Sequence, residues 1–235
     1  MKNNKYITVP NLFTTLNLFC GFLSVTLTIA GNFQYAAWII FAATVLDGLD
    51  GKIARASGEN SPFGLQMDSL SDLISSGMAP AILVYKFYFY QLGITGLFLS
   101  FLPLLFAAFR LARFNVLSME NGNKSGFYGL PAPMAAVSIS SIVILFNRVH
   151  ADFLLRTLVV FVPIISLLMA STIPYDTYPR FNLREKGSNR IKLLIFLVSV
   201  MFLVIYPSIA LPIVMLIYLL SGPVLLIFSW NQEEK

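Results

Sequence analysis

Apolar stretches of about twenty residues recur along the chain, and they constrain its fold more than any other feature. The first runs from Pro10 to Ala30 without a single charged residue. A stretch of about 20 apolar residues makes an α-helix long enough to cross the hydrocarbon core of a bilayer. Only 11% of the residues are charged, whereas about 25% are charged in an average soluble domain. The sequence therefore predicts an integral membrane protein.

Eight helices are expected from the apolar stretches and from the polar turn segments between them. Their expected ranges are 10–30, 33–56, 63–90, 93–117, 131–146, 152–172, 191–206 and 208–229. The short breaks are rich in Gly, Pro, Asn and Ser, which are typical of turns. We therefore expect an all-α, polytopic membrane helix bundle, folded as a single integral membrane domain over residues 1–235. The first apolar run is expected to be retained as a helix and not cleaved as a signal peptide.

The distribution of Lys and Arg predicts how this bundle is oriented. With the N-terminus in the cytoplasm, thirteen of the sixteen Lys and Arg fall on the cytoplasmic side, and only Lys86, Arg148 and Arg156 fall on the other. Because basic residues concentrate in cytoplasmic loops, we expect both termini on the cytoplasmic side of a cell (cytoplasmic or inner) membrane. The net charge of +5 then reflects these loops and anionic lipid, and not nucleic acid.

Four of the six aspartates gather where the second and third expected helices meet. They are Asp47, Asp50, Asp68 and Asp72. A carboxylate at membrane depth costs more than about 2.5 kcal/mol unless it is paired or wetted. At about 100° per residue, Asp47 and Asp50 fall within one arc of about 140° on the second helix, and Asp68 and Asp72 share one face of the third. Two carboxylate faces on adjacent antiparallel helices can therefore meet.

Carboxylates that meet must share protons or bind cations, because like charges at close range oppose one another's ionisation. Oxygen ligands favour Mg²⁺ or Mn²⁺ over Zn²⁺, and two such ions would suit phosphoryl transfer. Gly51, Ala54 and Gly64 on the same faces leave room for a flat ligand group, and Arg55 could hold a phosphate. The alternatives are a solvated helix–loop–helix without metal for the aspartates, and plain helix packing for the small residues.

The spacing of these residues carries a resemblance to a known family. The pattern D-x2-D-G-x2-A-R-x8-G-x3-D-x3-D over residues 47–72 is similar to the signature of the CDP-alcohol phosphatidyltransferase family. Residues 10–21 resemble the family's first helix, and residues 68–81, 110–115 and 129–133 resemble its phosphatidylserine synthase branch. The resemblance implies a six-helix family core over residues 8–172. A loop and two further transmembrane helices, residues 173–235, would form an extension.

Members of this family transfer a phosphatidyl group from a CDP-linked lipid to an alcohol and release CMP. The resemblance implies that Asp47, Asp50 and Asp68 bind metal ions, and that Asp72 both touches a metal and acts as the general base. It implies two ions of Mg²⁺ or Mn²⁺. With the small residues already described, the expected CDP-lipid site comprises Gly51, Ala54, Arg55, Ser61, Gly64, Asn11, Thr14 and Asn17.

The expected acceptor site lies on the fourth helix and in the loop that follows it. Its candidate residues are Arg110, Arg113, Asn115 and Lys124. A guanidinium can bind the carboxylate of serine through two parallel hydrogen bonds, in a bidentate contact. The expected substrates are therefore CDP-diacylglycerol and L-serine. The alternative is that these cations only extend toward the membrane surface and fix the topology. The resemblance also implies a homodimer surrounded by membrane lipid.

Two other functions stay open on the sequence. The same reaction could use another acceptor, such as glycerol 3-phosphate, an inositol phosphate or choline. A cation transporter could use the four aspartates as an ion path, although such paths usually run between two related halves of a transporter.

Overall fold

The chain forms a bundle of helices, and the computed structural model describes residues 9–57, 61–121, 129–173, 175, 201–203 and 205–233. No strand occurs among these residues. The helices are α1 (Val9–Ile29), α2 (Phe33–Ser57), α3 (Pro62–Asp72), α4 (Ala79–Phe87), α5 (Gly93–Asn121), α6 (Ala132–Val149), α7 (Asp152–Ala170) and α9 (Pro207–Glu233). A π-helix, Leu73–Met78, joins α3 to α4, and a 3₁₀-helix, Phe89–Leu92, precedes α5.

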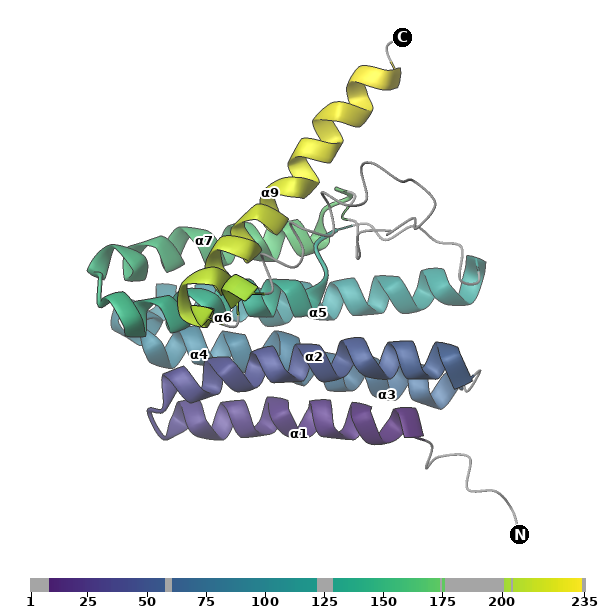
Figure 1. The fold of residues 1–235 in the computed structure, drawn as a ribbon, viewed down its shortest axis with the longest axis horizontal. Coiled ribbons are helices and arrows are strands. Elements are labelled where there is room, and N and C mark those ends of the chain that lie inside the picture. Colours follow the sequence, from purple (N-terminus) through teal and green to yellow (C-terminus); the bar gives the residue numbers. More distant parts are fainter. Residues whose placement is uncertain are drawn as a thin grey trace.

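The helices are arranged so that α1 packs against α2 and α3, and α6 connects α2 with the later helices α7 and α9. α1 contacts α2, α3 and α4, and α6 contacts α2, α7 and α9. Figure 1 shows α9 crossing the bundle obliquely, with its C-terminal end extending beyond the other helices. The carboxylate-bearing ends of α2 and α3 therefore lie against the first half of α1.

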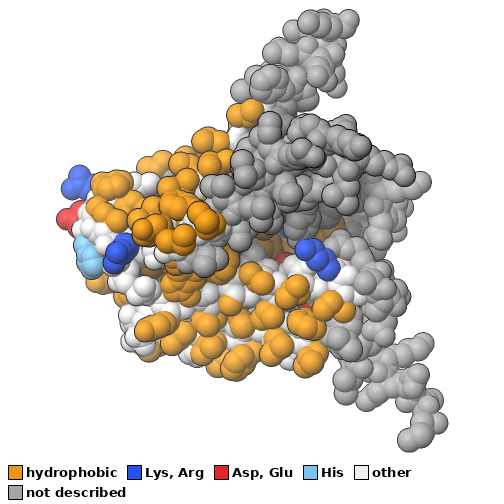
Figure 2. Space-filling view, in the orientation of Figure 1, with side chains coloured by type: hydrophobic (Ala, Val, Ile, Leu, Met, Phe, Trp, Pro, Cys, Tyr) orange, Lys and Arg blue, Asp and Glu red, His pale blue; other side chains and the backbone are white. Residues whose placement is uncertain are grey.

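Within the residues that the structure describes, five helical stretches are long and apolar enough to cross a membrane. They are Asn11–Ile29, Phe89–Leu117, Ala132–Val149, Asp152–Ala170 and Pro207–Val224. Large apolar side chains such as Phe22, Phe98 and Phe109 are exposed on the outside of the bundle, and hydrophobic side chains cover much of the described surface in Figure 2. Such a surface is stable in lipid and not in water. The prediction of a polytopic helical membrane protein is confirmed.

Most of the expected helices occur close to their expected ranges. α5 continues to Asn121 and α9 to Glu233, a few residues beyond the expected ends. Most of the seventh expected helix, residues 191–200 and 204, lies outside the described residues.

The third expected helix is continuous but not uniform. Its middle, Leu73–Met78, is a π-helix in which the Ala79 N–H donates to the carbonyl of Ile74, five residues back. Pro80 lies in the first turn of α4, directly after the π-helix. A proline has no N–H, and its ring crowds the carbonyl four residues before it. The wider turn of the π-helix relieves that crowding. π-Helices are frequent at functional sites, and this one begins immediately after Asp72.

α1 approaches the π-helix so closely that only glycine fits at the contact. An ideal Cβ at Gly21 would lie 2.8 Å from the Cα atom of Ser75. Gly21 and Ser75 are both buried. This contact fixes the distance between α1 and the helix that carries Asp68 and Asp72.

Candidate active site

Three aspartates from two helices form an acidic cluster. Asp47 and Asp50, on α2, and Asp68, on α3, each offer a carboxylate oxygen, and these oxygens all lie within 4.8 Å of one another. It is the one such group of possible metal ligands in the part of the chain that the structure describes. The meeting of the two carboxylate faces, expected from helix geometry, is therefore confirmed.

Asp72 joins this cluster through Asp47. The carboxyl groups of these two residues are hydrogen-bonding partners, and Asp72 is only 7% exposed. Two carboxyl groups can share a hydrogen bond only when a proton lies between them. A divalent cation bound by the same oxygens would replace that proton, because it satisfies both negative charges.

Side chains of α1 hold two of the four carboxylates. Thr14 Oγ1 donates to Asp50 Oδ2 at 3.1 Å, and Asn17 Nδ2 donates to Asp72 Oδ1 at 3.0 Å. Ser71 Oγ in turn donates to the carbonyl oxygen of Thr14 at 2.8 Å. Thr14 and Asn17, expected from the sequence at the CDP-lipid site, are thus brought to the aspartates themselves.

The donor set fits a hard divalent cation. All ligand atoms in the cluster are oxygens, as Mg²⁺ and Mn²⁺ prefer. Asn17 Oδ1 is also buried and has no hydrogen-bond partner among the described residues, and a buried amide oxygen left without a partner costs stability. An ion or its bound water in the cluster would supply one.

Asn115, on α5, forms hydrogen bonds with α3 next to Asp68. Its Nδ2 donates to Ser69 Oγ at 3.0 Å, and Ser69 Oγ donates to Asn115 Oδ1 at 3.2 Å. Asn115 is expected from the sequence at the acceptor site, and Ser71 on the carboxylate face of the third helix, whereas Ser69 is not singled out by the sequence. The signal was present in the string Asp68-Ser-Leu-Ser-Asp72, where small hydroxyl side chains alternate with the carboxylates.

Arg110 and Arg113 lie one helical turn apart on α5 but have different surroundings. Arg110 has Asp72 and Asp47 among its electrostatic partners, and its Nε is buried without a hydrogen-bond partner among the described residues. Arg113 donates from Nη1 to the carbonyl oxygen of Ala170 at 3.2 Å and from Nη2 to that of Ser171 at 3.4 Å. Arg110 thus faces the acidic cluster, and Arg113 binds the C-terminal end of α7.

Three of the residues expected at the CDP-lipid site meet where α3 begins. Ser61 is the N-cap of α3 and accepts a hydrogen bond of 2.9 Å from the Gly64 N–H. A Cβ at Gly64 would lie 3.1 Å from Ser61 Oγ and 3.3 Å from Asn11 Oδ1. Gly51 lies half-buried next to Asp50 in α2. The side chains of Ala54 and Arg55, and all of Lys124, lie outside the described residues.

The segment that carries the acidic cluster matches a known protein family. The model of the CDP-alcohol phosphatidyltransferase family matches residues 7–170, which include α1 to α7 and every residue of the acidic cluster. The chain belongs to the CDP-alcohol phosphatidyltransferase family. It is therefore an enzyme that transfers a substituted phosphate group.

Curated relatives resemble the chain over most of its length. A CDP-diacylglycerol–serine O-phosphatidyltransferase of Helicobacter pylori is 36% identical over 227 residues, covering 94% of this chain and 92% of the relative. One of the same name from Methanocaldococcus jannaschii is 34% identical over 219 residues, covering 93% and 94%. An archaetidylserine synthase of Methanothermobacter thermautotrophicus is 38% identical over 178 residues, covering 74% and 72%.

Proposed function

We propose that this enzyme transfers the phosphatidyl group of CDP-diacylglycerol to the hydroxyl of L-serine, forming phosphatidylserine and CMP. The observation that carries the proposal is the convergence of four aspartates and Arg110 at the α2–α3 junction. The names of the relatives from Helicobacter pylori and Methanocaldococcus jannaschii support serine as the acceptor.

Asp47, Asp50 and Asp68 are proposed to hold the divalent ions, with Asp72 completing the set. Bound Mg²⁺ or Mn²⁺, in two sites by this proposal, would neutralise the pyrophosphate and the leaving CMP. Thr14 keeps Asp50 in place through its 3.1 Å hydrogen bond. Because this donor belongs to α1, the ligand set is oriented before any substrate arrives.

Asp72 is proposed to act as the general base. Asn17 donates to its Oδ1 and thereby orients the carboxylate that takes the proton of the serine hydroxyl. Its burial keeps water from competing for that proton position. A carboxylate acts in this way when it lies within hydrogen-bonding distance of the attacking hydroxyl.

Arg110 is proposed to bind the carboxylate of serine. A buried guanidinium needs an anionic or polar partner, and Arg110 Nε has none among the described residues. Since Arg110 is an electrostatic partner of Asp72, a serine held by its carboxylate would place its hydroxyl close to the base. The contacts of Arg113 and Asn115 give these two residues a supporting role, and Lys124 stays a prediction.

The CDP-linked lipid is proposed to bind on the other side of the cluster. Asn11, Ser61 and Gly64 meet there, with Gly51, Ala54 and Arg55 on the facing end of α2. The acyl chains would stay in lipid, against the apolar outer surface of the bundle. The cytoplasmic orientation of the site and the homodimer stay predictions of the sequence.

An acceptor panel tests the proposal. The purified enzyme is supplied with CDP-diacylglycerol, Mg²⁺ or Mn²⁺, and either L-serine, glycerol 3-phosphate, an inositol phosphate or choline. CMP release and the lipid product are measured. We expect phosphatidylserine from serine and no CMP from the other acceptors. Turnover with another acceptor alone would reject serine but keep the reaction class, and folded enzyme that releases no CMP with any acceptor would reject both.

A matched pair of variants accompanies the panel. Asp72→Asn should abolish CMP release. Asp152→Asn makes the same chemical change at an exposed position in the first turn of α7, and should leave CMP release unchanged. Near-normal rates in Asp72→Asn would remove Asp72 from the role of base.

A further inference from the structure

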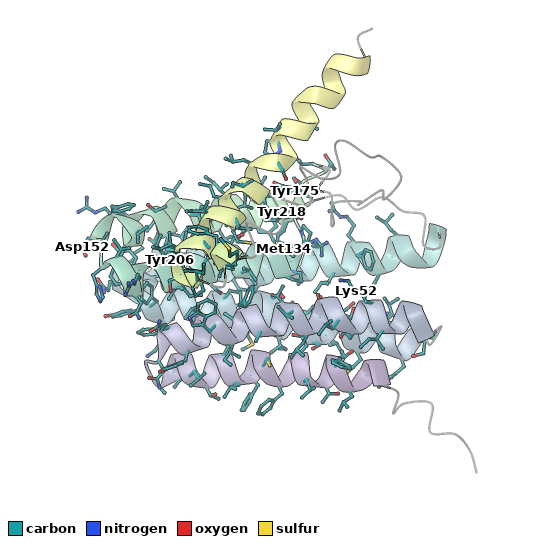
Figure 3. The ribbon with its side chains drawn as sticks, in the orientation of Figure 1. Lys52, Met134, Asp152, Tyr175, Tyr206 and Tyr218 are labelled. Carbon is teal, nitrogen blue, oxygen red and sulfur yellow. The ribbon has the colours of Figure 1, made fainter. Side chains whose placement is uncertain are left out.

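A cavity of about 310 Å³ lies where α2 begins, α6 ends and α9 begins. The residues that line it are Gln34, Asn147, Arg148, Ile205, Tyr206, Pro207, Ser208 and Ile209. Gln34 and Asp47 are 13 residues apart on α2, which is about 20 Å at 1.5 Å per residue. Figure 3 shows Tyr206 and Asp152 toward one end of the bundle and Lys52 toward the other. The cavity is therefore separate from the active site.

This cavity lies at the level where candidate membrane-spanning helices end. One such stretch, Ala132–Val149, ends beside it, and another, Pro207–Val224, begins at it. The ends of membrane spans lie among the lipid headgroups. Tyrosine is enriched at that level, because its ring is apolar and its hydroxyl is polar, and Tyr206 is exposed in the lining. A lipid that enters the cavity from the bilayer would therefore place its headgroup there.

The polar groups that line the cavity are mostly hydrogen-bond donors without a partner. The guanidinium of Arg148 and the hydroxyls of Tyr206 and Ser208 make no hydrogen bond or ion pair with the described residues. Asn147 Nδ2 donates to Gln34 Oε1, which leaves the N–H groups of Gln34 available. None of the described lining residues is Asp or Glu. This donor set carries one positive charge and suits an anion.

The start of α9 strengthens the preference for an anion. The N–H groups of Ile209 and Ala210 donate to the carbonyl oxygen of Tyr206, so this 27-residue helix begins at the cavity. The N-terminal end of a helix carries a partial positive charge, which attracts phosphate groups. Ile205 and Ile209 are exposed in the same lining. An apolar chain can therefore lie next to a bound phosphate.

We propose that this cavity is a second lipid-binding site, which takes the phosphate of a membrane phospholipid. The Arg148 guanidinium binds two phosphate oxygens in a bidentate contact, and the Ser208 hydroxyl and the Gln34 amide donate to the phosphate as well. These residues belong to α6, α9 and α2. Because α9 lies outside the segment that the family model matches, one bound phosphate connects this additional helix to two helices of the family core.

Thermal unfolding of the full chain in detergent tests this site. We expect dioleoyl phosphatidylglycerol to raise the melting temperature, because a ligand that binds the folded state stabilises it. Dioleoylglycerol, which lacks the phosphate, and inorganic phosphate, which lacks the acyl chains, should have no such effect at the same concentration. In Arg148→Gln, the phosphatidylglycerol concentration that gives half of the rise should increase roughly tenfold, as for a lost hydrogen bond to a charged group.

Two further variants complete the test. Ser208→Ala removes one hydroxyl donor and should weaken the response to phosphatidylglycerol about threefold or more, and it decides the matter if Arg148→Gln does not fold. Arg156→Gln removes the same charge at an exposed position on α7 and should leave the response unchanged. CMP release without added phosphatidylglycerol should equal that of the wild type in all three variants, because none of them alters the active site.

Several results would overturn the proposal. It fails if phosphatidylglycerol does not stabilise the wild type, or if Arg148→Gln and Ser208→Ala respond like the wild type. Equal weakening in Arg156→Gln and Arg148→Gln would indicate a general effect of surface charge. Equal stabilisation by dioleoylglycerol would indicate apolar contact alone, and equal stabilisation by inorganic phosphate would assign the cavity to free phosphate. None of these results depends on which acceptor alcohol the enzyme uses, so they leave the proposed function untouched.

Discussion

The carboxamide of Asn17 donates a hydrogen bond of 3.0 Å to the carboxylate of Asp72, joining positions that are 55 residues apart in the chain. Both side chains are buried. The bond orients the Asp72 carboxyl group. Because the donor lies on α1, the first helix takes part in the site although it carries no charged residue within Asn11–Ile29.

Replacing Asn17 by Ala should therefore slow turnover strongly. Loss of a hydrogen bond to a charged group costs about 1.5–3 kcal/mol, which corresponds to a decrease in kcat of roughly 10- to 100-fold. CMP release at saturating substrates measures it. Thr15→Ala is the control, since the Thr15 hydroxyl is exposed and bonds only within α1, to the Asn11 carbonyl. Equal kcat values for the two variants would contradict the role of Asn17.

Removing the metal should abolish activity reversibly. We expect a chelator to stop CMP release and added Mg²⁺ or Mn²⁺ to restore it, because hard cations bind oxygen ligands of this kind. Binding of Mn²⁺, followed by electron paramagnetic resonance without substrate, should weaken at least tenfold in Asp47→Asn and Asp68→Asn. Asp152→Asn should bind like wild type. Unchanged Mn²⁺ binding in both cluster variants would reject the acidic cluster as the metal site.

Adding a single methyl group at Gly21 should disturb the whole site. In Gly21→Ala the new Cβ would lie 2.8 Å from Ser75 Cα, and backbone cannot yield as a flexible side chain can. Overpacking of this kind costs about 1–3 kcal/mol. We expect a lower melting temperature in detergent and weaker Mn²⁺ binding, because α1 would move away from α3. Phe22→Leu, at an exposed neighbouring position, should change neither, and an unaltered Gly21→Ala protein would show that the contact can relax.

Arg113 should prove to be a supporting residue. Its guanidinium bonds the carbonyl oxygens of Ala170 and Ser171, so Arg113→Ala leaves the end of α7 with fewer donors. We expect the melting temperature to fall by a few degrees, as for a loss of about 1–2 kcal/mol, and the KM for serine to stay within threefold. Arg156→Ala, at an exposed position on α7, is the control. A large rise in the KM for serine without loss of stability would instead place Arg113 in the acceptor site.

Much of the fold was predictable because its signals are local. Apolar runs and the turns between them predicted most of the described helices to within a few residues, since a helix in lipid must satisfy its own backbone hydrogen bonds. The π-helix at Leu73–Met78 was not predicted, because it arises from the crowding of Pro80 against a buried turn. The closeness of α1 to Ser75 was not predicted either, because it depends on which glycine faces which helix.

The contacts of the candidate site likewise comprise some that were predictable from the sequence and some that were not. The meeting of Asp47, Asp50 and Asp68 followed from helix periodicity, a property of neighbouring residues. The contacts of Thr14 and Asn17 with the carboxylates, and the bonds of Arg113 to the end of α7, join residues 36 or more positions apart. Such pairings are set by how helices pack, which a single sequence does not reveal.

The π-helix after Asp72 sets the rotation of one half of a continuous helix relative to the other. A π turn holds one more residue than an α turn, so it offsets the faces on either side of it by about 100°. On one side, Asp68 and Asp72 face the acidic cluster, and on the other, Ala79 and Leu83 lie fully buried in the core. Deleting one residue within Leu73–Met78 would remove this offset and rotate the carboxylates out of register with α2.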